Sequence, residues 1–427
     1  MNRRIWLGGV VLACATAAYA EFAQQGPKLV AAEGFLEGNS VAISGDGNTA
    51  IIGGGPAFIW SRSGGVWSQQ SPRLEGSGAV PGIRDNTTAV AISADGNTAI
   101  VGVPRDNNSV GAAWIWIRSG NAWIQQGPKL VASDAVMTGG DIGGHQGASV
   151  SLSADGNTAI IGSPADNHNA GAVWIWGRGG EVWTQQTLKL VGSGAIGNAW
   201  QGTSVALSAD GNTAIVGAPG DNGDIHGDAG AAWVWTRSGG LWRQQSKLAG
   251  AVRSRAAGQG QSVALSADGN TALVGGPGDE SVWVWIRNGE VWTQQGETLF
   301  FRDLSQFNQA KSFPGGLGFS VSLSADGNTA LIGAPLLAGP QPDPSTGLVD
   351  GSAWIWIRSG GVWHQQAGNL IGVDGAEASQ GTSVALSADG KTAIVGGYSD
   401  RRFLGAAWVF AAGGVPASAP RRRSIKH

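Results

Sequence analysis

The chain has 427 residues, of which 72 are glycine, and charged residues make up only 13%. A net charge of -3 offers no basic stripe, so nucleic acid is excluded as a partner. The single cysteine, Cys14, lies in a leader that we expect to be removed, which excludes disulfides and thiol chemistry from the mature chain.

Residues 1–20 have the pattern of a secretory signal peptide. Arg3 and Arg4 precede an apolar run, and Ala18-Tyr19-Ala20 forms a small-x-small cleavage site. We therefore expect export, to the medium, the periplasm or the cell surface. The arginine pair leaves a twin-arginine route open, and Cys14 leaves a lipoprotein anchor open. No later stretch approaches the ~20 apolar residues of a transmembrane span.

One segment recurs seven times and organises the rest of the chain. Its clearest copy, Ser204 to Pro219, places an Asp-Gly pair between two apolar runs, which is a strong hairpin signal. The Asp-Gly pairs begin at Asp46, Asp95, Asp155, Asp210, Asp268, Asp326 and Asp389, with gaps from 49 residues (46 to 95) to 63 residues (326 to 389). This period is typical of a propeller blade.

The fourth copy contains the complete unit. We predict four strands in it, over Ser204 to Ser208, Thr213 to Gly217, Ala231 to Arg237 and Leu241 to Leu248. The last copy lacks a fourth strand, while residues 22–30 resemble one that precedes the first copy.

The sequence thus predicts an all-β, seven-bladed propeller of four-stranded antiparallel blades over residues 21–415, with an N-terminal strand completing the last blade and closing the ring. We expect the basic tail over residues 416–427 to be disordered and the protein to be a monomer.

The third strand of most copies carries two tryptophans. In the fourth copy, Trp233 and Trp235 share one face of the strand, and Ala232 and Val234 share the other. Bulky residues on one blade can then fill the small-residue face of its neighbour. We interpret these pairs as core residues and not as a platform for sugars.

The unit resembles an FG-GAP repeat, the blade of the integrin α-chain N-terminal propeller and of many exported bacterial proteins. The resemblance rests on Gly202-Thr203-Ser204-Val205-Ala206 with Gly217-Ala218-Pro219, and on the same pattern at Gly318-Phe319-Ser320-Val321 with Gly333-Ala334-Pro335. It implies extracellular recognition. Integrin-like blades often carry a calcium loop in the first turn, but here that turn is shortened to one carboxylate, Asp210 in the fourth copy. We interpret it as a turn former and expect no cofactor, with calcium as the alternative.

The loops on the opposite face differ between copies, and binding usually resides in such loops. The loop between the second and third strands nearly vanishes at Gly55-Pro56 and swells over Leu336 to Gly351. Trp200 lies outside the repeated pattern and is a candidate contact aromatic. The ligand-binding candidates on this face are Asp106, Asn107, Asp166, Asn167, Trp200, Asp221 and Asn222, with turn formation as the alternative role of the Asp-Asn pairs.

Three carboxylates, Asp221, Asp224 and Asp228, are a weak candidate for a metal site, and the alternative is a polar loop that caps its own backbone. No catalytic constellation recurs in the chain. We therefore expect a binding or adhesion module for an extracellular protein or glycan. The alternatives are a propeller enzyme acting on exported polysaccharide through these acids, and a structural envelope protein without a discrete ligand.

Overall fold

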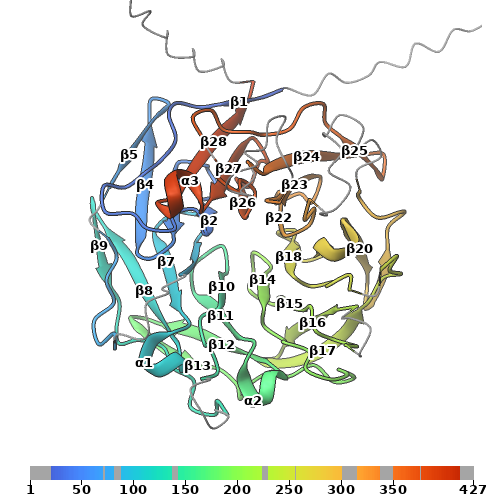
Figure 1. The fold of residues 1–427 in the computed structure, drawn as a ribbon. Coiled ribbons are helices and arrows are strands. Elements are labelled where there is room, and N and C mark those ends of the chain that lie inside the picture. The colour runs from blue at the N-terminus through green and yellow to red at the C-terminus, as the bar shows by residue number, and fades with distance from the viewer. Residues whose placement is uncertain are drawn as a thin grey trace, which may run out of the picture.

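The computed structural model describes residues 21–70, 73–80, 88–136, 143–223, 229–254, 256–300, 315–336, 350–375 and 377–413. Within these residues the chain forms seven four-stranded antiparallel sheets arranged in a ring (Figure 1), so the predicted seven-bladed propeller is confirmed. The expected leader (1–20), the expected tail (416–427) and most of the Leu336 to Gly351 loop lie outside the described residues. In the described ranges, no helix has the length and apolar character needed to cross a membrane.

Each blade is a meander in which the strands pair in chain order from the axis outward, except that the outermost strand of blade 7 comes from the N-terminus. Blade 1 comprises β2 (Ser40–Ile43), β3 (Thr49–Gly53), β4 (Ala57–Ser63) and β5 (Val66–Gln69). Blade 2 comprises β6 (Ala89–Ile92), β7 (Thr98–Val103), β8 (Ala112–Ser119) and β9 (Ala122–Gln125). Blade 3 comprises β10 (Ser149–Leu152), β11 (Thr158–Ser163), β12 (Ala172–Gly179) and β13 (Val182–Gln185). Blade 4 comprises β14 (Ser204–Leu207), β15 (Thr213–Ala218), β16 (Ala231–Ser238) and β17 (Leu241–Leu248).

The remaining three blades follow the same plan. Blade 5 comprises β18 (Ser262–Leu265), β19 (Thr271–Gly276), β20 (Ser281–Asn288) and β21 (Val291–Gln294). Blade 6 comprises β22 (Ser320–Leu323), β23 (Thr329–Ala334), β24 (Ser352–Ser359) and β25 (Val362–Gln365). Blade 7 comprises β26 (Ser383–Leu386), β27 (Thr392–Gly397), β28 (Ala406–Ala412) and β1 (Phe22–Gln24). Single turns α1 (Asp106–Ser109), α2 (Asp166–Asn169), α3 (Asp400–Phe403) and η1 (Pro277–Asp279) lie between the second and third strands of their blades.

The N-terminal strand closes the ring. β1 pairs antiparallel with β28, with Phe22 opposite Ala412, and Leu29 forms a further bridge to Ala407. In Figure 1 the blue β1 accordingly lies beside the red β28. The inner strands β2 and β26 also contact each other, so the array has no open end. This is the closure that the orphan strand in the sequence predicts.

The Asp-Gly pairs form the turns between the first and second strands. In blade 1, Asp46 accepts hydrogen bonds from the Ser44 hydroxyl (2.5 Å) and the Asn48 backbone N–H (2.9 Å). Gly47 has φ +70°, and a Cβ there would lie 2.8 Å from Thr392 of the neighbouring blade. Burial raises the pKa of Asp46, but these hydrogen bonds outweigh it and hold the pKa below its usual value. The carboxylate therefore works as a turn former, as predicted.

Tryptophans of the third strand fill the space between blades. Trp174 and Trp176 of blade 3 belong to one buried cluster with Ile100, Ala113 and Ile115 of blade 2. Trp174 is fully buried, as are its equivalents Trp114, Trp233, Trp283, Trp354 and Trp408. Replacing one such ring by alanine typically costs about 3–5 kcal/mol. The tryptophan pairs are thus core residues that pack in the interfaces between blades.

Ring closure also rests on a buried ion pair at the end of the closing segment. Lys28 donates to Asp400 Oδ2 (2.5 Å) and to the Asp374 carbonyl (2.6 Å), and the two ion-paired side chains are 6% and 0% exposed. Lys28→Ala leaves Asp400 as a buried charge without its cation, so we expect a loss of about 3 kcal/mol or more in unfolding free energy, measured by chemical denaturation.

A matched control for this variant is Lys391→Ala. The Lys391 ammonium lies 4.0 Å from Asp389, and both side chains are mostly exposed. We expect its stability to stay within about 0.5 kcal/mol of wild type. Equal stability of the two variants would contradict a role for Lys28 in closing the ring.

Candidate functional site

The Asp-Asn pairs lie on the face opposite the Asp-Gly turns, where they fasten two loops together. In blade 3, Asp166 is fully buried, accepts from the Val136 backbone N–H (2.6 Å) and pairs with Lys189 Nζ (2.6 Å). The Asn167 backbone N–H donates to the Val136 carbonyl (3.0 Å). The loop between the second and third strands is thereby fixed both to the incoming inter-blade loop and to the outer strand.

The same fastening occurs in blades 2 and 4. Asp106 accepts from Val80 and pairs with Lys129, and Asp221 accepts from Ile196 and pairs with Lys247. All three carboxylates are at most 3% exposed, whereas the side chains of Asn107, Asn167 and Asn222 are exposed. On this face the asparagines, rather than the aspartates, are therefore presented to solvent.

Trp200 is the exposed aromatic that the sequence singles out. Its side chain is 39% exposed, and its backbone, at φ +55°, donates from N–H to the Asn169 carbonyl (2.9 Å). The ring packs over Gly220, where a Cβ would lie 3.0 Å from Cε3 of the indole. Trp200 thus lies between the loops of blades 3 and 4, with part of one ring face open.

The candidate metal residues are only partly visible. Asp224 and Asp228 lie outside the described residues, and Asp221 is held by Lys247 at 2.7 Å. Over the described ranges, no three His, Cys, Asp or Glu side chains gather in an arrangement that could hold a metal ion.

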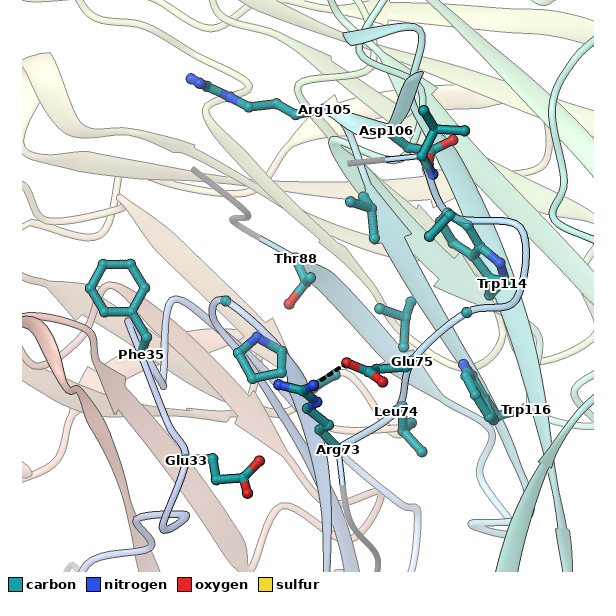
Figure 2. Close-up of a pocket in the computed structure, with 18 residues that line it drawn as sticks. Glu33, Phe35, Arg73, Leu74, Glu75, Thr88, Arg105, Asp106, Trp114 and Trp116 are labelled. Atoms are coloured by element: carbon teal, nitrogen blue, oxygen red, sulfur yellow. Dashed lines mark hydrogen bonds and ion pairs between the residues drawn. The ribbon is translucent and has the colours of Figure 1, made fainter. Parts of the chain in front are cut away.

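A large hollow on the loop face lies where the repeat is interrupted. Between β3 and β4 of blade 1 only residues 54–56 intervene, whereas residues 164–171 separate the corresponding strands of blade 3. Blade 1 consequently lacks both the loop and its buried aspartate. The space left is a pocket of about 730 Å³ between blades 1 and 2, lined by Phe35, Arg73, Leu74, Glu75, Trp114 and Trp116 among others (Figure 2). We call it the inter-blade pocket.

The inner wall of the inter-blade pocket is apolar and aromatic. Leu74, Trp114 and Trp116 are at most 8% exposed, and Figure 2 shows both indoles on one side of the space. Trp114 Nε1 donates to the Ser77 carbonyl (3.0 Å), whereas Trp116 Nε1 is buried without a hydrogen-bond partner. The equivalent nitrogens of Trp60, Trp285 and Trp356 are also unpaired, so this property belongs to the strand position and not to the pocket.

The rim of the inter-blade pocket carries charges of both signs. Arg73 stands where blades 2, 3 and 4 have Lys129, Lys189 and Lys247. With no buried aspartate in its blade, it pairs instead with Glu75 (2.5 Å), and the two side chains are 47% and 66% exposed. Glu33 and Arg105 also line the pocket. Because the exposed ion pair of Arg73 with Glu75 contributes little to stability, these two side chains can turn toward a ligand at small cost.

The sequence-based candidates did not include the rim residues Phe35, Arg73 and Glu75. The signal for them was the near absence of the loop at Gly55-Pro56, which marks a junction without a loop to fill it. The arginine at the lysine position was a second signal. Asp106 is the one candidate that lines the pocket.

The fold and this pocket define a seven-bladed propeller with an irregular first junction. Searches of the sequence against protein-family models and against curated proteins find no match.

One buried carboxyl on this face replaces an amide of the repeat. Gln201 accepts from the Gly192 N–H (2.5 Å) and donates to the Gly192 carbonyl (3.1 Å). At the junction of blades 7 and 1 the equivalent residue is Glu37, 1% exposed, whose two carboxyl oxygens both accept from the Ala31 N–H (3.0 Å each). Burial raises the pKa of Glu37 to about 7, despite the opposing hydrogen bond from Ala31.

Because the pKa of Glu37 is raised, we predict that the free energy of unfolding decreases as pH rises. Below the ordinary value of 4.5 the carboxyl is protonated in both states and costs nothing. Between pH 4.5 and about pH 7 the carboxyl ionises only in the unfolded state, which destabilises the fold progressively. Above about pH 7 this loss in unfolding free energy is complete and amounts to up to about 3 kcal/mol. We expect Glu37→Gln to be more stable than wild type at pH 8 and equal to it near pH 4, measured by denaturant unfolding across this range.

The reciprocal variant provides the control. Gln201→Glu introduces a buried carboxyl at the equivalent position, so it should lose stability as pH rises through the same window. A Glu37→Gln variant whose advantage did not change between pH 4 and pH 8 would refute the assignment.

Proposed function

We propose that this protein is an exported binding module that recognises an extracellular glycan or protein through its loop face, with the inter-blade pocket as the main contact. The observation that carries the proposal is the pocket itself. It combines an aromatic inner wall with a charged, exposed rim, and its volume of about 730 Å³ falls in the range of ligand sites. Recognition needs no metal in this proposal, and the module works as a monomer.

The position of the pocket supports the same function. A propeller presents its loops on a rigid scaffold, and variation in those loops creates sites without disturbing the core. The wall residues belong to strands that the blade interface already holds in place, so the site is formed before a ligand arrives. The Gly-x-Ser-Val pattern, carried by six of the seven repeats, favours kinship with FG-GAP propellers, whose use in extracellular recognition is consistent with this proposal.

Polysaccharide cleavage by the acidic loop of blade 4 has less support. A general acid or base must reach its substrate. Of the acids considered for this role, Asp221 is 1% exposed and paired with Lys247.

Ligand binding through the inter-blade pocket is tested by filling it. Ala79 lines the pocket with an exposed side chain, so Ala79→Trp should occupy the space without disturbing the core. On arrays of glycans and surface proteins, we expect the mature wild-type chain to give hits that EDTA leaves unchanged. Ala79→Trp should weaken them at least tenfold.

The matched control is Ala195→Trp. Ala195 holds the same repeat position at the junction of blades 3 and 4 and is also exposed. This variant should bind like wild type. Equal losses in the two variants, or no hit on either array, would argue against the proposed site.

Export is tested on protein recovered from its natural host. We expect the mature chain to begin at Glu21 and to appear outside the cytoplasm, as cleavage after Ala20 requires. Intact mass spectrometry of fractionated cells measures this, and a cytoplasmic chain that retained residues 1–20 would contradict it.

A further inference from the structure

The single turns α1, α2 and α3 share an unusual backbone conformation. In each turn, the three residues after the buried aspartate have positive φ angles, so the turn is left-handed; these residues are 107–109, 167–169 and 401–403. In blade 7 the three φ angles are 50°, 59° and 69°. A left-handed turn brings Cβ close to the following carbonyl oxygen, so it is unfavourable for most residues and least so for glycine and asparagine.

The same backbone hydrogen bonds hold this turn in all three blades. In blade 7 the Leu36 N–H donates to the Phe403 carbonyl (2.9 Å), and the Gly405 N–H donates to the Asp400 carbonyl (2.9 Å). Blades 2 and 3 have the equivalent bonds, which are His145 to Ser109, Gly111 to Asp106, Trp200 to Asn169 and Gly171 to Asp166. The turn therefore forms with very different side chains in its three left-handed positions.

The side chains of these positions in blade 7 depart from the repeat. Blades 2 and 3 use mostly asparagine, with Asn107-Asn108-Ser109 and Asn167-His168-Asn169. Blade 7 has Arg401, Arg402 and Phe403 instead. These bulky side chains make the backbone of the turn less favourable, so they bring no advantage to its formation. Residues held in a costly backbone conformation cluster at functional sites.

Both arginines of the turn present their charge to solvent. Arg401 and Arg402 are exposed, and over the described ranges neither guanidinium forms an ion pair or a hydrogen bond. Asp400, the carboxylate at the start of the turn, is fully buried and already paired with Lys28. The two positive charges are thus available to a partner.

Apolar side chains accompany the arginines. Phe403 is 41% exposed and Leu404 is 45% exposed, and the Phe403 ring packs on one side against Tyr398, with 6.1 Å between the ring centres. We call residues 401–404 the arginine turn. In Figure 1 its helical part, α3, lies on the side of blade 7 that faces blade 1, in agreement with the hydrogen bond from Leu36.

This combination of side chains fits an acidic segment of a protein. A guanidinium matches the two oxygens of a carboxylate, and arginines beside aromatic residues are typical of the energetic centre of a protein interface. The whole chain has a net charge of -3, so an attraction for acids must come from local arginines.

The apolar residues favour a protein over a membrane or a glycan. Phe403 and Leu404 are more than half buried, so they form a shallow surface and do not project far enough to enter a bilayer. The branched side chain of Leu404 offers no flat face to a sugar ring, whereas it packs readily against an apolar side chain.

Going beyond the proposed function, we propose that the arginine turn is a docking surface for an acidic segment of another protein, one that carries an apolar side chain among its acids. Arg401 and Arg402 pair with carboxylates of the segment, and Phe403 and Leu404 pack against its apolar side chain. The turn is fixed through Asp400 and Leu36 before the partner arrives, so little order is lost on binding. This surface is separate from the inter-blade pocket.

The test screens the mature chain against an array of short random peptides, and calorimetry then measures the best binder. We expect the hits to be enriched in Asp and Glu around an aromatic or aliphatic residue. The matched peptide with Asn and Gln in place of its acids should bind about tenfold more weakly. The double variant Arg401→Asn with Arg402→Asn should bind the acidic peptide no more tightly than the amide peptide.

The stability of this double variant provides a second readout. It installs the residues that blade 2 carries as Asn107 and Asn108, which tolerate positive φ better than arginine does. We therefore expect the midpoint of urea unfolding to equal or exceed that of wild type while the affinity for the acidic peptide falls. A lower midpoint would show that the arginines serve the fold, and it would overturn the inference.

The matched control removes the same charge elsewhere. Arg243 and Lys391 are exposed and lie outside the arginine turn, and Arg243→Thr with Lys391→Asn installs the residue types of Thr184 and Asn328 at the equivalent positions. This control should bind the acidic peptide like wild type. A loss equal to that of the double arginine variant would reduce the effect to net charge and contradict a local surface.

The remaining outcomes separate this inference from the proposed function. Peptide binding that is lost in Ala79→Trp and kept in the double arginine variant would place the segment in the inter-blade pocket, which would overturn the inference and support the proposed function. An array without a preference for acidic peptides would also overturn the inference. So would anionic phospholipid vesicles or oligogalacturonate that bind through the two arginines where acidic peptides do not.

Discussion

The rest of the structure depends on the packing of bulky third-strand side chains of one blade against a face of small and aliphatic residues on the next. Trp174 and Trp176 can lie against Ala113 and Ile115 because successive strand residues point to opposite faces, so each blade offers one large and one small surface. Each interface needs a neighbour on both sides. An open array would expose one tryptophan-bearing face, and this explains why β1 crosses to the last blade to complete it.

A core repeated this closely leaves the loop face free to vary. The ion pair of the buried Asp166 with Lys189, and its counterparts in blades 2, 4 and 7, fix the loops by contacts within the protein, so those loops add rigidity and not ligand-binding charge. Blade 1 has no such loop and no buried aspartate to pair with Arg73, so the Arg73 side chain is exposed at the surface. The same loss creates both the space and the available charge of the inter-blade pocket. The pocket therefore exists because blade 1 lacks a loop that other blades have.

Most of the fold was predictable because it is written seven times. The fourth strand of blade 4, predicted over Leu241 to Leu248, has those bounds in β17, and the others differ by one residue at most at an end. The site was less predictable. The sequence places Asp106 on the loop face, but the direction of its carboxylate depends on Lys129, 23 residues later, and on the distant N–H of Val80. Local pattern does not encode such pairings, nor the pocket that a missing loop leaves.

Residues that depart from the repeat indicate where the protein has given up stability for binding. Glu37 stands in a position that Gln201 fills without an ionisable group, and its burial costs stability at neutral pH. It lies close in the sequence to Glu33 and Phe35, which line the inter-blade pocket. Arg73, which stands at a lysine position of the repeat, lines the same pocket. A departure that costs stability, next to residues that line a pocket, is the pattern expected where local consistency has been given up for binding.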